Sequence, residues 1–135
     1  MEASERAYGY TTSWFIIDRS GAGGGSIVIG GTDARSEQWT RVISSRAAHM
    51  LWFRLTQVLF PERAEWLTPM DTLPIRDSTL PTITNQVIVE RLEGGVIEIT
   101  GIAKGSRWTA KLLESESTAL WAALKHHSTL AISQS

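Results

Sequence analysis

The sequence predicts an α+β fold made of one unit, three strands followed by a helix, that occurs twice in a single domain. The main observation is a repeat, because the segment Trp39–Leu55 recurs in altered form as Trp108–Leu124. Each copy starts with Trp-Thr and has a second tryptophan, preceded by leucine (Trp52 and Trp121). The chain has only six tryptophans, so two matched pairs indicate an internal duplication with a period of 69 (108 − 39).

The composition is that of an ordinary globular domain, with 42% hydrophobic and 20% charged residues in a chain of 135 residues. A net charge of −1 gives no basic footprint for nucleic acid or for an anionic membrane. The absence of cysteine excludes disulfides and thiolate metal sites. No apolar run approaches the ~18 residues that span a bilayer. The first residues do not resemble a signal peptide, so a cytoplasmic protein without membrane contact is expected.

Three strands are expected at the start of the first repeat. Residues 8–19 are rich in aromatic and β-branched side chains, which is typical of a strand. The glycine run at 21–25 is too flexible for the interior of an element and predicts a hairpin loop. Residues 26–30 and 39–43 supply the second and third strands, and the polar residues 1–7 are expected to fray.

A helix is expected from about Arg46 to Phe60. The hydroxyl of Ser44 or Ser45 can accept a hydrogen bond from a free amide of its first turn, and Pro61 ends it. Apolar residues recur at intervals of three and four, as in a helix that packs one broad face on a core. They are Ala48, Leu51, Trp52, Leu55, Val58 and Leu59.

The connector at 61–84 contains all four prolines of the chain and is expected to be largely extended. Trp66 and Arg76 lie in it, and it has no counterpart before the first repeat. A long apolar connector can be a binding surface. It can equally be a strap that ties the two halves together, and the sequence leaves both interpretations open.

The second repeat covers residues 85–126, as the first covers residues 8–60. Its strands are expected at 85–92, 96–103 and 108–113, with a turn at Glu93-Gly94-Gly95 and a helix over about 115–125. The second strands of the two copies align at an offset of 70 (97 − 27). The first strands align at an offset of 72 (87 − 15), which places Phe15 over Val87.

Each unit alone has too little core to fold by itself. We therefore expect a single domain over residues 1–135, in which a pseudo-twofold axis relates the two βββα units. Antiparallel sheets with two packed helices would then enclose one core.

The tryptophans divide into two classes. Trp52 and Trp121 lie on the apolar faces of the expected helices, where core packing explains them. Trp39 and Trp108 lie on strands, and two interpretations remain open for them, a core position or an exposed stacking platform. Arg41 shares the strand face of Trp39 and favours a wetter position there.

The order of elements resembles that of the PUR-repeat and Whirly-like proteins, which bind single-stranded nucleic acid. The resemblance covers most of the chain in element order and includes no sequence motif. It implies a curved sheet that holds single strands through stacked aromatic rings and basic side chains. Three strands per unit are expected here, where those families have four, and either the connector or the stretch Tyr8–Tyr10 could supply another.

No residue set indicates catalysis, a cofactor or a metal. The glycines at 21–25 lack the following Lys-Ser/Thr and helix of a phosphate-binding loop. The histidines at 49, 126 and 127 have no metal-ligand spacing, and no nucleophile-elbow motif is present.

The sequence therefore predicts a non-enzymatic binding or assembly module. Its expected partner is another protein, or a second copy bound through a sheet edge. The alternative is a single-stranded nucleic-acid-binding protein that uses sheet aromatics and basic side chains. The candidate contact residues combine aromatic and basic side chains: Trp39, Arg41, Trp108, Lys111, Arg19, Arg91, Trp66 and Arg76.

Overall fold

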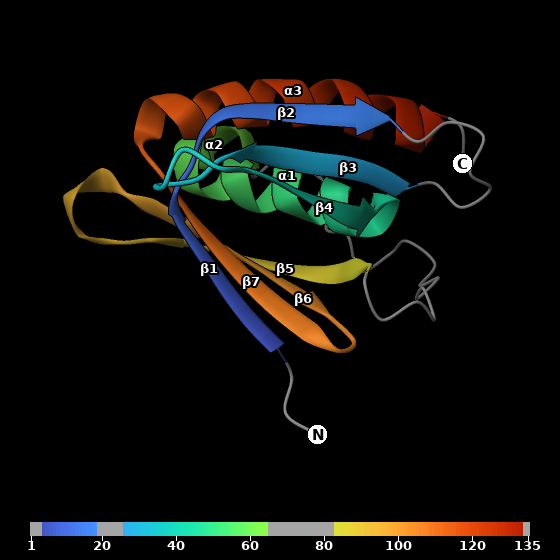
Figure 1. Ribbon diagram of the computed structural model, residues 1–135. Helices are drawn as coiled ribbons and strands as arrows, with labels where there is room; N and C mark the ends of the chain where they lie inside the picture. Colours follow the sequence, from blue (N-terminus) through green and yellow to red (C-terminus); the bar gives the residue numbers. More distant parts are fainter. Residues whose placement is uncertain (1–3, 19–25, 65–82, 134–135) are drawn as a thin grey trace.

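The computed structural model describes residues 4–18, 26–64 and 83–133. These residues form an α+β fold with one seven-stranded sheet, whose strand order is β1-β7-β6-β5-β4-β3-β2. The helices lie behind the sheet in Figure 1 and cover one of its faces. The opposite face is called the outer face. Arg19, Trp66 and Arg76 lie outside the described residues.

The strands alternate with helices in two rounds. The strands of the first round are β1 (Ser4–Tyr10), β2 (Thr12–Asp18), β3 (Ser26–Thr32) and β4 (Gln38–Ser44), followed by α1 (Ser45–Leu59) and α2 (Pro61–Ala64). The second round contains β5 (Thr84–Arg91), η2 (Glu93–Gly95), β6 (Ile97–Ala103), β7 (Ser106–Leu112) and α3 (Glu114–Ser133). The predicted connector begins with α2, and α3 continues beyond its predicted end.

The sheet is mixed, so the expectation of purely antiparallel sheets is wrong for two strand pairs. β4 pairs with β5 in parallel, through the single pair Ile43–Thr84, and β1 pairs with β7 in parallel. The other neighbours are antiparallel. The long connection after β4, which includes α1, brings the chain back in its original direction, and parallel pairing follows from such a crossover.

Residues 4–7 are not part of a frayed arm but belong to a strand, which corrects a second expectation. Residues 4–18 form two strands instead of one, and these strands lie at opposite edges of the sheet. The chain passes between the edges at Thr11, whose amide donates to the carbonyl of Lys111 at 2.9 Å. Positive φ angles at Gly9 (71°) and Ser13 (54°) redirect the backbone on either side of Thr11.

The strand pairing shows which residues of the first half correspond to which residues of the second. It corrects the predicted alignment of the first strands. Ile16 pairs with Ile29 in the first half, and Val89 pairs with Ile99 in the second. The first strands therefore match at an offset of 73 (89 − 16), not 72, while β3 and β6 match at 70 (99 − 29). A slip of one residue moves a side chain to the other face. Phe15, predicted to match the buried Val87, lies on the outer face.

Local signals explain the helix and turn boundaries. The Oγ of Ser44 accepts a hydrogen bond from the amide of Ala47 at 3.0 Å, so the predicted cap of α1 is confirmed. α1 ends where Pro61 follows. Gly94 and Gly95 have φ angles of 76° and 78°, which explains the two glycines of the predicted turn before β6.

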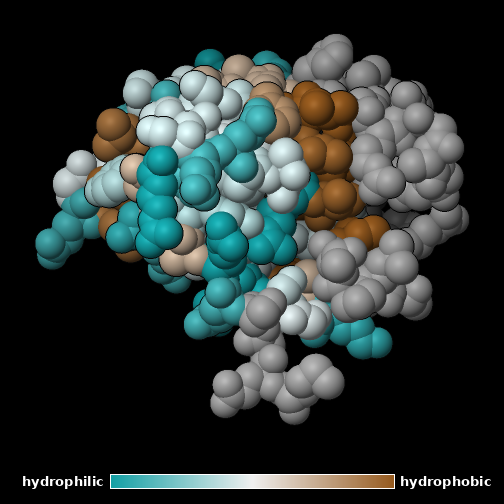
Figure 2. All heavy atoms as spheres, in the orientation of Figure 1, coloured by the Kyte–Doolittle hydropathy of each residue, from teal (hydrophilic) through white to brown (hydrophobic). Residues whose placement is uncertain are grey.

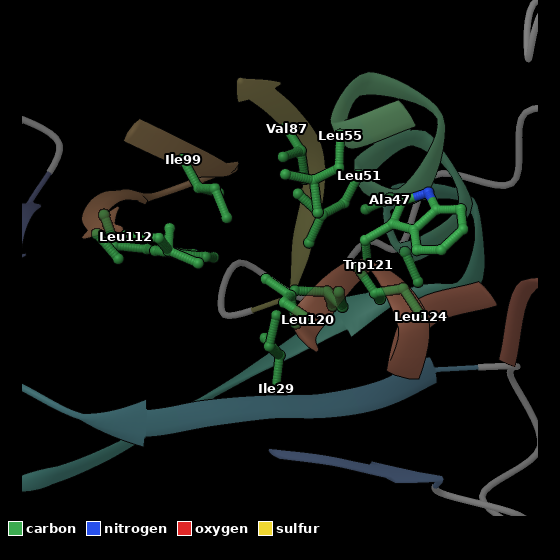
Figure 3. Packing of buried hydrophobic residues seen from close by; sticks show 14 of the residues in the cluster. Ile29, Ala47, Leu51, Leu55, Val87, Ile99, Leu112, Leu120, Trp121 and Leu124 are labelled. Carbon is green, nitrogen blue, oxygen red and sulfur yellow. The ribbon is translucent and has the colours of Figure 1, made fainter. Parts of the chain in front are cut away.

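Each long helix packs mainly against the sheet of the other half. α1 lies along β5, α3 lies along β2, and the two helices contact each other. The indole Nε1 of Trp121 in α3 donates to the Oγ1 of Thr56 in α1 at 2.8 Å. Figure 3 shows Leu120 of α3 pointing towards Ile29 of β3, with Leu51 and Leu55 of α1 beside Val87 of β5. The core is therefore shared by both halves.

Two tryptophans join the halves inside this core. Trp39 and Trp108 have ring centroids 5.3 Å apart. The Nε1 of Trp39 donates to the Oγ1 of Thr11 at 3.2 Å, and that of Trp108 donates to the Oγ1 of Thr84 at 2.9 Å. Gly101 lies opposite Trp108 in the sheet, and a Cβ there would overlap the indole. A glycine is therefore required opposite this ring.

We expect Thr84→Val to lower the free energy of unfolding by about 1–3 kcal/mol, because the buried Nε1 of Trp108 would lose its acceptor. Thr109→Val is the control, since Thr109 lies half-buried on the outer face of the same sheet. Urea denaturation measures both variants. Equal losses of stability would show that the hydrogen bond from Trp108 has no such role.

Candidate interaction surface

The two strand tryptophans are core residues. Only 6% of Trp39 and 1% of Trp108 are exposed, and both rings belong to the buried cluster on the helix side of the sheet. Tyr8 stacks on Trp39, with ring centroids 4.1 Å apart and an interplanar angle of 3°. Of the two interpretations that the sequence allowed, burial supports core packing. Neither ring is available in this structure as a platform for a ligand.

The basic candidate residues do not gather on one surface. Arg41 lies on the helix side of β4, half-buried, and its Nε donates to the Oη of Tyr8 at 2.8 Å. Arg91 donates from Nη2 to the carbonyl of Val58 in α1 at 3.1 Å. Lys111 lies on the outer face beside Glu98. The structure therefore separates the candidates among the core, the end of α1 and the outer face.

A row of apolar side chains crosses the outer face of the first half. Ile17, Val28 and Val42 are directly opposite one another in β2, β3 and β4, and this set is called the apolar row. Ile17 is 54% exposed, and the two valines are half-buried. Figure 2 shows hydrophobic atoms in a band across these strands, beside a hydrophilic surface.

The matching row of the second half is charged. The positions of Ile17, Val28 and Val42 correspond to Glu90, Glu98 and Lys111, at offsets of 73 (90 − 17), 70 (98 − 28) and 69 (111 − 42). These three residues also lie opposite one another in β5, β6 and β7, and they are called the charged row. Because the same position of the sheet accepts charges in one half, the fold does not require apolar side chains in the other.

The sequence contains a signal for the apolar row, namely continuous apolar runs in two of the strands. Strands with one wet face alternate apolar and polar residues, whereas strands that bury both faces have continuous apolar runs. Trp14-Phe15-Ile16-Ile17 and Ile27-Val28-Ile29 are such runs. They indicate two apolar faces, of which the helices cover only one.

A second feature lies on α1, outside the predicted set. His49 is only 7% exposed, and its ring lies 5.4 Å from that of the half-buried Trp52. Within the described residues, His49 Nδ1 and Trp52 Nε1 are buried without a hydrogen-bond partner. Burial lowers the pKa of His49 below its ordinary value, because desolvation disfavours the charged imidazolium. His49 is therefore a neutral residue of the folded interior at pH 7.

Other classes of site find no support in the described part of the chain. No three His, Asp or Glu residues there are close enough to hold a metal ion. No helix there is long and apolar enough to cross a membrane. No family model, curated protein or solved structure matches the chain.

We expect the protein to lose stability as the pH falls below about 6.5, the ordinary pKa of histidine. Below that value the unfolded chain takes up a proton at His49, whereas the folded protein does so only at a lower pH. His49→Leu should flatten this part of the curve. Urea denaturation at pH 7.5, 6.5 and 5.5 measures the slope. Parallel curves for both proteins would contradict the assignment to His49.

Proposed function

We propose that the protein is a non-enzymatic binding or assembly module that contacts another polypeptide through the apolar row. The observation that carries this proposal is the difference between the two rows. Ile17, Val28 and Val42 lie where the other half has Glu90, Glu98 and Lys111. An exposed apolar patch with a polar surround is typical of a protein contact surface.

The apolar row would supply part of the binding energy of such a contact. Full burial of a Val or Ile side chain contributes about 1.5–3 kcal/mol relative to full exposure. The apolar row is partly buried already, so its contribution on binding is smaller than three such terms. It can supply the central contacts of an interface whose rim is polar. A cytoplasmic location completes this proposal, since a chain without cysteine has no disulfide that would need an oxidising compartment.

We also propose that the chain arose by duplication of a βββα unit whose copies are related by a pseudo-twofold axis. Each half has a three-stranded meander, β2-β3-β4 or β5-β6-β7, with the same register. Each has a core tryptophan whose Nε1 donates to a threonine hydroxyl. Those threonines, Thr11 and Thr84, are separated by the same offset as Ile16 and Val89 (84 − 11 = 89 − 16). β1 has no matching strand among the described residues.

The alternative proposal is a single-stranded nucleic-acid-binding protein. It requires exposed aromatic rings for base stacking and a basic surface. Trp39 and Trp108 are buried, and Lys111 lies in a row with two glutamates. These observations support the protein-binding proposal better. A gel-shift titration with single-stranded DNA and RNA, at low and moderate salt, separates the two. Strong, salt-dependent shifts would favour the alternative.

The charged row supplies a matched variant for testing the main proposal. The triple variant Ile17→Glu, Val28→Glu and Val42→Lys places the side chains of the second half at the matching positions of the first. We expect it to keep the fold, because half-exposed surface changes usually cost less than about 1 kcal/mol each, and to lose the contact with its partner. Circular dichroism and thermal melting check the fold.

The contact itself is measured by photocrosslinking from a benzoylphenylalanine at position 28, in the cells that produce the protein. Position 98 is the control, since it is the matching half-buried site on the outer face of β6. We expect position 28 to give a defined crosslinked polypeptide that nuclease does not remove. Position 98 should give a weaker adduct. The adduct from position 28 should disappear when Ile17→Glu and Val42→Lys are added to the same chain. Equal adducts from both positions would overturn the assignment of the apolar row.

A further inference from the structure

Corresponding residues of the two halves also differ in chemistry at one position on the helix side of the sheet. Arg41 of β4 matches Ala110 of β7, which is fully buried. The fold therefore accepts a small apolar side chain at this position. The first half instead holds a half-buried guanidinium there. Partial removal of a charge from water costs free energy unless a partner of opposite charge compensates it.

We propose that Arg41, Arg6 and Tyr8 form a binding site for the phosphate group of a small phosphorylated molecule. Tyr8 is the fixed element of this site, since its ring is 8% exposed and stacks on Trp39 at 4.1 Å. Its Oη accepts the hydrogen bond from Arg41 Nε at 2.8 Å. That bond occupies Nε and orients the guanidinium, and the proposed ligand binds its Nη groups.

Arg6 places a second cation beside the same ring. The guanidinium carbons of Arg6 and Arg41 lie 5.6 and 5.7 Å from the centroid of Tyr8. Arg6 and Tyr8 are two residues apart in β1, as Trp39 and Arg41 are in β4, so both cations are anchored on strands. Both guanidinium groups therefore lie beside one ring, and an anion that binds either of them is also attracted by the charge of the other.

The described residues offer these cations no carboxylate. No ion pair between described residues involves Arg6 or Arg41; Glu5, the acidic neighbour of Arg6 in β1, pairs with Arg107 at 4.0 Å. Asp33 lies in the turn beside Tyr8, but its Oδ1 accepts hydrogen bonds from the amides of Arg35 and Glu37. The positive charge is therefore uncompensated by the described part of the protein.

The chemistry of the site favours phosphate over other anions. A guanidinium presents paired N–H donors that match two oxygens of a phosphate or carboxylate, and two guanidiniums match the charge of a phosphate dianion better than that of one carboxylate. The rings of Tyr8 and Trp39 cannot stack on a base, because they are buried against each other. The site thus fits the phosphate alone.

The test is a titration of the full chain with inorganic phosphate at constant ionic strength, followed by thermal melting and by calorimetry. We expect saturable stabilisation, and no effect of acetate or chloride at equal ionic strength. Arg41→Met should weaken phosphate binding by about tenfold or more, since a hydrogen bond to a charged group contributes about 1.5–3 kcal/mol. Arg6→Met should weaken it to a lesser extent.

Arg54→Met is the control, because Arg54 is an exposed arginine of α1 that donates to Gln57. It should bind phosphate as the unaltered protein does. Circular dichroism checks the fold of Arg41→Met. Should that variant not fold, Arg41→Lys and Tyr8→Phe replace it, and both should weaken binding by removing the oriented Nε contact.

Unchanged affinity in a folded Arg41 variant would overturn the proposal. Stabilisation that is equal in acetate, or that does not saturate, would also overturn it. The apolar row lies on the opposite face of the sheet, so these outcomes leave the proposed protein contact unaffected. Loss of photocrosslinking at position 28 would, conversely, say nothing against the phosphate site.

Discussion

The contact between Trp39 and Trp108 joins the two halves of the sheet, and the rest of the structure depends on that junction. The backbone contributes little there, because β4 and β5 share the single residue pair Ile43–Thr84. Between β4 and β5 side chains supply what the hydrogen-bond ladder does not, although β1 of the first round also pairs with β7 of the second. The two indoles lie 5.3 Å apart, and each donates its N–H to a buried threonine hydroxyl. Aromatic pairs at such distances stabilise beyond the area they bury.

The helices complete the junction by crossing it. α1 follows β4 in the chain but lies along β5, and α3 follows β7 but lies along β2. Each helix therefore covers the sheet of the other half, so neither half keeps a covered sheet when the other is removed. The hydrogen bond from Trp121 to Thr56 links the two helices directly. Both halves therefore share one buried core, as short units with little core of their own require.

The sequence predicted most of the strands and the two long helices because their signals are local. Hydrophobic periodicity, the serine cap of α1 and the paired glycines before β6 all act within a few residues. The two parallel strand pairs depend instead on which strand the chain pairs with after a long connection, and in which direction. No local sequence pattern indicates this. The offset of 72 failed for a related reason. Phe15 and Ile16 are both apolar, and only the pairing partners Gly30 and Ile29 show which of them faces the helices.

The candidate surface was predicted less well than the fold, and the reason is physical. Tryptophan and arginine are common at binding surfaces, yet Trp39 and Trp108 are the side chains that the junction needs most. Arg91 donates to the end of α1, and among the candidates that the structure describes only Arg41 keeps a proposed role in ligand binding. The apolar row consists of ordinary isoleucine and valine, which any strand can contain. Its position became informative only when the register matched it to Glu90, Glu98 and Lys111.

The matching positions of the two halves therefore differ where the fold permits more than one side chain and agree where packing requires one. Where both halves hold the same chemistry, as with the two indoles or with Ile29 and Ile99, packing explains it. The apolar row and Arg41 differ from their counterparts in opposite senses. One places apolar side chains where charges are accepted, and the other places a charge where alanine is accepted. Neither feature is needed by the scaffold. The apolar row exposes apolar surface to water, and Arg41 partly removes a charge from water. A bound protein partner would cover the first, and a bound anion would compensate the second.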